Sequence, residues 1–191
     1  MKRWLSSAWA RLLPSSGDAL HRRQAGLVIA TCLGLAAAIL LLILVWLSSG
    51  DLQWETTVAG GIFCLILASI AALARKGRGI TSVWLLAGLL AVLITLDAGS
   101  YGLGSPAAAG FVIPIVLTAC GVGLWAGIGV ACYAAAAVWI IAVAGQAGWY
   151  IPYGPFDISH LTFNAPAYTV IFLLVALIVG LWECNRTPDQ C

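Results

Sequence analysis

Long runs of apolar residues, separated by short polar segments, dominate the chain from Ala25 onward. Most runs are long enough to cross a hydrocarbon core ~30 Å thick as a helix. The stretch from Ala107 to Ala144 carries no charge and is nearly twice that length at ~1.5 Å per residue, so we expect two helices there, joined at residues 121–123. The pattern predicts transmembrane helices over residues 25–47, 57–74, 80–96, 107–121, 124–144 and 166–182.

The composition supports a membrane protein. Of 191 residues, 62% are hydrophobic and 8% are charged, which is too little charge to cover the surface of a soluble domain of this length. The predicted fold class is therefore all-α, a polytopic integral membrane protein built as a six-helix bundle.

The distribution of positive charge predicts the orientation of the bundle. Every Lys and Arg can lie on one side of the membrane. The charged residues in the segments on the other side are all acidic, namely Asp51, Glu55, Asp97 and Asp157. Because basic residues stay cytoplasmic, we expect both ends of the chain in the cytoplasm of a bacterium, with the bundle in its plasma membrane. The residues that set this topology most directly are Arg22, Arg23, Arg75, Lys76 and Arg78.

The two ends of the chain are predicted to lie outside the bundle. Residues 1–24 form a basic segment whose first part, up to Pro14, has an amphipathic pattern typical of a helix in the headgroup region, although a frayed leader is the alternative. Residues 183–191 form a short cytoplasmic tail. Tryptophans expected at the membrane interfaces are Trp4, Trp9, Trp46, Trp149 and Trp182.

Small residues recur at every fourth position in several predicted helices. In lipid there is little hydrophobic drive for helices to associate, so close backbone approach along such ridges supplies the packing. The sequence predicts helix-packing positions at Gly34, Gly60, Gly127 and Ala131.

Few residues offer chemistry, and no catalytic motif, nucleotide-binding loop or metal-ligand spacing is present in the sequence. Asp97 and His160 are the candidate ligand-binding residues, at the outer end of the third helix and in the outer loop 145–165; for each, a solvated surface side chain is the alternative. The cysteines are expected to be thiols, either packed within helices or, for Cys184 and Cys191, in a reducing compartment. The sequence names no cofactor and leaves bound lipid, quinone or pigment open.

Several segments together resemble a known family. The first is the charged segment at 18–25, which precedes a Leu/Ala-rich helix. The others are Asp97-Ala98-Gly99, the Gly-Leu-Trp-Ala-Gly turn at 123–127, and the loop IPYGPFDISHLTFNAP before the last helix. This layout resembles the six-helix N-terminal membrane region of bacterial sensor histidine kinases of the Chloroflexi type. The resemblance implies an input fold, here without a kinase or other output domain, that acts through partners.

We therefore expect a protein that is not an enzyme. The favoured function is a non-catalytic membrane subunit or accessory protein that packs into a larger membrane complex, an energy-transducing one being a candidate. The alternative is a stand-alone sensory or ligand-binding membrane module, and a small transporter is third. Expected partners are the lipid bilayer and other membrane protein subunits, and not nucleic acid.

Overall fold

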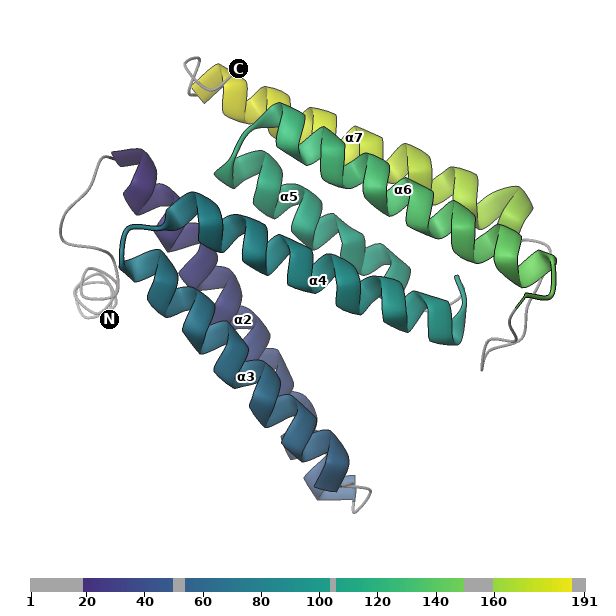
Figure 1. Ribbon diagram of the computed structural model, residues 1–191, viewed down its shortest axis with the longest axis horizontal. Coiled ribbons are helices and arrows are strands. Elements are labelled where there is room, and N and C mark those ends of the chain that lie inside the picture. Colours follow the sequence, from purple (N-terminus) through teal and green to yellow (C-terminus); the bar gives the residue numbers. More distant parts are fainter. Residues whose placement is uncertain (1–18, 50–53, 104–105, 150–159, 187–191) are drawn as a thin grey trace. The chain divides into compact units, whose positions relative to one another are not determined.

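The structure is a computed structural model that describes residues 19–49, 54–103, 106–149 and 160–186. Within these ranges every secondary-structure element is a helix, and short turns join them (Figure 1). The elements are α2 (Ala19–Ser49), α3 (Trp54–Arg75), α4 (Gly79–Tyr101), the 3₁₀ helix η1 (Pro106–Phe111), α5 (Val112–Gly121), α6 (Leu124–Gln146), the π-helical turn η2 (His160–Asn164) and α7 (Ala165–Arg186).

The predicted all-α class is confirmed, and so is the multi-pass membrane character. Among the described residues, five helices are long and apolar enough to cross a bilayer, over Leu20–Val45, Thr57–Arg75, Gly79–Tyr101, Leu124–Gln146 and Thr162–Asn185. The apolar segment Pro106–Gly121 is shorter. Helices are the expected solution for such sequences, because backbone groups in hydrocarbon must be satisfied within their own segment.

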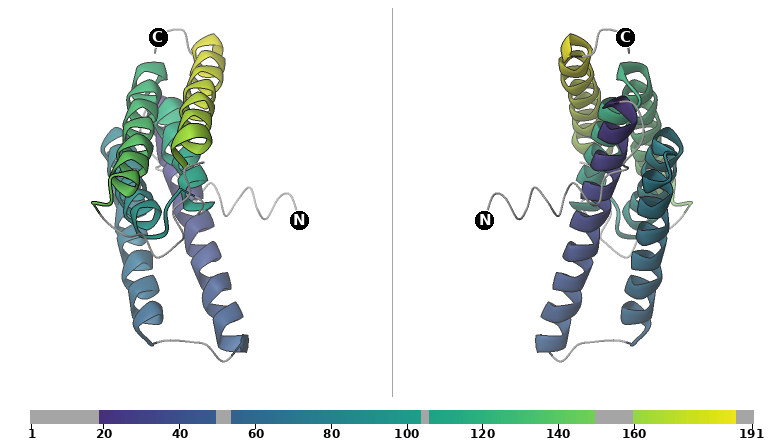
Figure 2. Two further views of the ribbon diagram at one scale, coloured as in Figure 1. Left: turned by 90° about the vertical axis from the view of Figure 1, so that its right-hand side faces the viewer. Right: turned by 90° about the vertical axis from the view of Figure 1, so that its left-hand side faces the viewer.

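The chain divides into two compact units, with the boundary within α4 between Leu86 and Ala87. In the first unit, α2 and α3 form an antiparallel hairpin that is visible in both views of Figure 2. Gly60 of α3 lies against α2, where an added Cβ would come within 3.3 Å of Ile39 and of Ile43. At the other end of the hairpin, Gly79 packs on the buried side chain of Gln24, so α4 begins in close contact with α2.

The second unit contains the main hydrophobic core. Helix α6 packs most extensively on α7 and next on α5, and α5 also packs on α7. Fully buried Phe111, Ile115, Val138 and Phe172 come from η1, α5, α6 and α7 respectively, so every one of these elements contributes to the same core.

The two consecutive apolar helices of this unit are separated by a sharp turn. Helix α5 ends at Gly121 and α6 begins at Leu124, within the segment where the sequence places the break. The N–H groups of Val122 and Gly123 both donate to the Thr118 carbonyl oxygen, and Gly123 has a φ of 136°. That backbone conformation is open to glycine and strained for other residues, which explains why the uncharged run turns here.

Helix boundaries differ from the sequence prediction in two places. Helix α4 continues to Tyr101, beyond the predicted end at residue 96, because Ala98 packs in the hydrophobic core while Asp97 is exposed. The fourth predicted helix is α-helical only from Val112, and residues 106–111 are 3₁₀-helical. Pro114 has no N–H to donate to the Gly110 carbonyl, which removes an α-helical bond at this junction.

Gly127 provides a test of the packing between α5 and α6. A Cβ at this position would lie 2.7 Å from the Cβ and 3.1 Å from the Cα of Ala119, and neither atom can move without the backbone. We expect Gly127→Leu to lower the free energy of unfolding in detergent by ~1–3 kcal/mol. Gly129→Leu is the matched control, because a Cβ there meets nothing within 4 Å. Equal stability of the two variants would contradict this packing.

Candidate functional site

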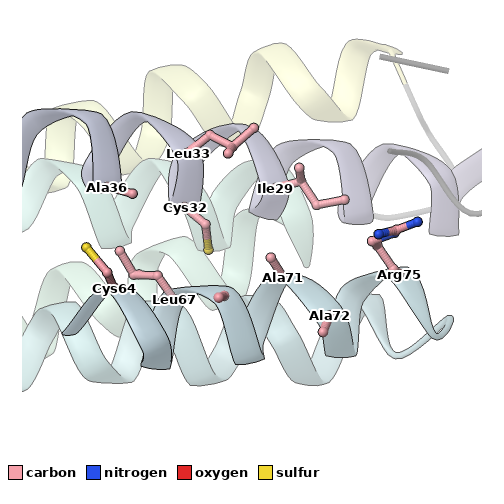
Figure 3. Close-up of a pocket in the computed structure, with 10 residues that line it drawn as sticks. Ile29, Cys32, Leu33, Ala36, Cys64, Leu67, Ala71, Ala72 and Arg75 are labelled. Carbon is pink, nitrogen blue, oxygen red and sulfur yellow. The ribbon is translucent and has the colours of Figure 1, made fainter. Parts of the chain in front are cut away.

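A groove of about 280 Å³ lies between α2 and α3 in the first unit (Figure 3). It is lined from both helices by mostly small and apolar side chains, namely Ile29, Cys32, Leu33, Ala36, Cys64, Leu67, Ala68, Ala71, Ala72 and Arg75. Alanine and cysteine side chains are too short to meet across the hairpin, and this leaves the space between the helices unfilled.

Among the described residues, Arg75, the last residue of α3, is the only charged one that lines the groove. Figure 3 shows its guanidinium at one end of the groove, between the two helices. The side chains of Cys32 and Cys64 point toward each other's helix further along. Cys32 is buried and Cys64 half-buried, and both are free thiols. The groove is therefore hydrocarbon-like along its length and cationic at one end.

The second unit is organised around an aromatic cluster. Phe111 makes edge-to-face contacts with Tyr133 and Phe172, with ring centroids 6.4 Å and 5.7 Å apart. Phe172 also stacks on Tyr168 at 5.7 Å. These geometries are favourable for aromatic pairs, so the cluster joins η1, α6 and α7 by specific contacts as well as by burial.

Two side-chain hydrogen bonds join α6 to α4 and to α7. The Tyr133 hydroxyl lies 3.1 Å from Thr95 Oγ1 in α4, and Trp139 Nε1 donates to Thr169 Oγ1 in α7 at 3.1 Å. Both threonines donate their own protons to helix carbonyls, Thr95 to Ala91 and Thr169 to Ala165. Each threonine oxygen is therefore left as an acceptor, so Tyr133 is the donor to Thr95.

The structure places the four predicted packing residues in different surroundings. Gly127 and Ala131 are buried in the second unit, and Gly60 lies against α2. Gly34 is exposed, and a Cβ there would meet nothing within 4 Å. Small residues follow Gly60 on α3 at four-residue spacing, but they differ in surroundings: Gly60 packs closely, while Cys64, Ala68 and Ala72 line the groove.

The two predicted ligand-binding residues are not brought into a common site. Asp97 lies near the end of α4 with an exposed side chain. His160 is the first residue of η2, and its side chain lies outside the described part of the chain. In the described ranges there is also no group of three or more His, Cys, Asp or Glu residues arranged to hold a metal ion.

The aromatic and basic residues expected at the membrane surfaces lie near helix ends. Trp149 is 79% exposed just beyond α6, and Trp182 is 51% exposed in the last turns of α7. The backbone of Trp46 lies in α2, and Trp4 and Trp9 fall outside the described residues. The predicted topology residues Arg22, Arg23, Arg75, Lys76 and Arg78 all lie at the end of the first unit where α2 begins, α3 ends and α4 begins.

Three features of α7 differ from the sequence prediction or were absent from it. Glu183 is only 4% exposed although it was expected in a polar tail, because α7 continues to Arg186. One turn earlier, Gly180 packs directly on Leu124 at the start of α6, so α7 is held close to the bundle up to this point. Cys184 is disulfide-bonded, which corrects the expectation of a free thiol there.

Comparisons with protein families, with curated proteins and with solved structures found no match for this chain.

The bond between Tyr133 and Thr95 can be measured with a double-mutant cycle. Tyr133→Phe and Thr95→Val each remove a hydroxyl with little change in size. We expect a coupling of ~0.6 kcal/mol between the two substitutions in detergent unfolding, which is the usual size for such bonds between membrane helices. As a control, Tyr133→Phe combined with Thr169→Val should be additive, since Thr169 bonds to Trp139. Additivity of the first pair would show that the bond contributes nothing.

Proposed function

We propose that this protein is a non-catalytic integral-membrane subunit or accessory protein that binds another membrane protein through one face of α2. The observation that supports the proposal is an exposed ridge of small residues. Ala30, Gly34 and Ala38 follow one another at four-residue spacing and are all exposed. We call these three residues the α2 ridge.

The α2 ridge has the character of a helix-packing surface. Small residues at this spacing let a second helix approach the backbone closely, and the resulting van der Waals contact is a main source of association in lipid. If the α2 ridge faced only lipid, small residues there would stabilise the protein no more than leucines would. Exposed leucines occupy much of the remaining surface of α2, at Leu40, Leu41 and Leu44. Only 17% of the apolar stretch of α2 is buried, against 44% of that of α6, so α2 has surface left for a partner.

The chemistry of the chain also supports a binding role. The sequence has no catalytic motif, and two pairs of polar side chains in the second unit, Tyr133 with Thr95 and Trp139 with Thr169, join helices to one another. An energy-transducing complex is a candidate host.

A ligand-binding sensory module is the second candidate, and the groove between α2 and α3 is the observation that favours it. The two functions use different sides of α2. With successive residues ~100° apart around the helix, Cys32 and Ala36 of the groove lie nearly opposite the α2 ridge.

We further propose that the chain crosses the bacterial plasma membrane six times with both termini in the cytoplasm. The count of six depends on the short segment Pro106–Gly121, which would be the fourth crossing along the chain. Its 3₁₀ part rises ~2.0 Å per residue and its α part ~1.5 Å, which gives ~27 Å in total, close to a hydrocarbon core of ~30 Å. Six crossings also keep the basic turn at 75–78 and the basic residues at both ends of the chain on one side.

Ala147, just after α6, distinguishes six crossings from five. If Pro106–Gly121 crosses the membrane, Ala147 is external; if it does not, Ala147 is cytoplasmic. We expect a membrane-impermeant maleimide to label Ala147→Cys and Ser100→Cys in intact cells, in a background without other cysteines. Lys76→Cys should react only after the cells are opened. Labelling of Ser100→Cys without Ala147→Cys would indicate five crossings.

Substitution of Gly34 tests the partner surface directly. A leucine there has space in the isolated chain, so Gly34→Leu should leave unfolding in detergent unchanged. It should reduce recovery of a co-purifying membrane protein at least tenfold, because the added side chain separates the two backbones. Gly88→Leu in α4 is the control, since it is equally unobstructed. A chain that purifies alone under mild detergent, with or without these substitutions, would favour the sensory module.

A further inference from the structure

We propose that the groove between α2 and α3 holds one acyl chain of an anionic glycerophospholipid, whose phosphate binds Arg75. The inference concerns the first unit only and does not depend on whether the protein assembles with a partner. Three properties of the groove support it: its length, its narrowness and the position of its one charged residue.

The groove has the length of a single membrane leaflet. Along α3 it extends from Cys64 to Arg75, which at ~1.5 Å per residue is about 16 Å. Half of a ~30 Å hydrocarbon core is about 15 Å. An acyl chain whose headgroup lies at the level of Arg75 would therefore reach the bilayer midplane at Cys64, where the groove ends.

The groove is narrow and apolar between these two points. The groove lies between two helices that pack on each other, so it has no room for a third helix, which is at least ~10 Å across with its side chains. Water would find few hydrogen-bond partners among the alanines, and a buried water needs two or more. A flexible hydrocarbon chain suits both the width and the chemistry. It can enter from the surrounding lipid, because Leu33, Ala68 and Ala72 at the rim are exposed.

The charge at the end of the groove selects an anionic headgroup. Arg75, Lys76 and Arg78 are exposed within four consecutive positions, and the guanidinium of Arg75 reaches between the helices (Figure 3). Among the described residues of this unit, the only carboxylate is Glu55, twenty residues away at the other end of α3, or ~30 Å along its axis. A guanidinium binds a phosphate through two parallel hydrogen bonds, so Arg75 would hold the headgroup as well as attract it.

Native mass spectrometry of the detergent-solubilised full chain tests the proposal. The protein is incubated with equal amounts of phosphatidylglycerol and phosphatidylcholine of identical acyl chains, and the ratio of the two singly bound species is measured. We expect phosphatidylglycerol to be preferred. Arg75→Gln should reduce this preference about fivefold, as expected for the loss of one close basic residue. Lys76→Gln, which removes the same charge outside the groove, should change it less than twofold.

A second pair of variants tests the acyl chain separately from the headgroup. Ala68→Leu fills the groove and should reduce binding of both lipids at least threefold without changing their ratio. Ala59→Leu, at an exposed alanine of α3 outside the groove, should leave both unchanged. Monodisperse elution of all four variants is the folding control. Equal effects of Arg75→Gln and Lys76→Gln, or unaltered binding by Ala68→Leu, would overturn the site.

Discussion

The absence of water from the hydrocarbon core is the constraint on which the rest of this structure depends. Every backbone N–H and C=O there must find a partner within the protein, and helices provide one for each residue. The side-chain hydroxyls follow the same rule. Thr31, Ser69, Thr95, Thr118 and Thr169 each donate to a carbonyl four residues earlier in the same helix. A hydroxyl satisfied in this way keeps an acceptor, which Tyr133 and Trp139 use to join helices.

The same constraint explains why the two units differ. Between helices in lipid, stability comes from close contact and from a few polar bonds, because apolar side chains gain little by leaving lipid. The second unit uses both, with Gly127 and Gly180 at backbone contacts and the aromatic cluster around Phe111. The first unit leaves the α2 ridge and the groove uncovered. These two surfaces remain available for binding, the α2 ridge for a helix of another protein and the groove for a lipid acyl chain.

Much of the fold could be predicted from the sequence because apolar run length decides where helices form. The glycines at 121 and 123 also mark the turn within the uncharged stretch. Local patterns could not show which small residues pack closely. Gly60 and Ala68 lie on the same four-residue ridge, yet one meets the isoleucines of α2 and the other lines a groove. The difference arises from the partner residues on α2, where Ile39 and Ile43 fill the space and Ala36 leaves it open.

The candidate site was harder to predict than the fold. Charge counting identified Arg75 as a topology signal, but only the pairing of α2 with α3 places it at the end of a groove. Glu183 was read as part of a polar tail because the apolar run ends at Trp182, whereas helix packing at Gly180 keeps the next turn near the bundle. In both cases the missing information was which helix lies beside which.

Hydrogen–deuterium exchange in proteoliposomes is the most direct test that these helices lie within a bilayer. The account predicts slow exchange across the interiors of α2, α3, α4, α6 and α7, and equally slow exchange over residues 112–121, because none of these amides meets water. Fast exchange at 112–121 with protection of the other five segments would show that the fourth crossing does not exist. Fast exchange in α2 and α3 would contradict the membrane-spanning bundle as a whole.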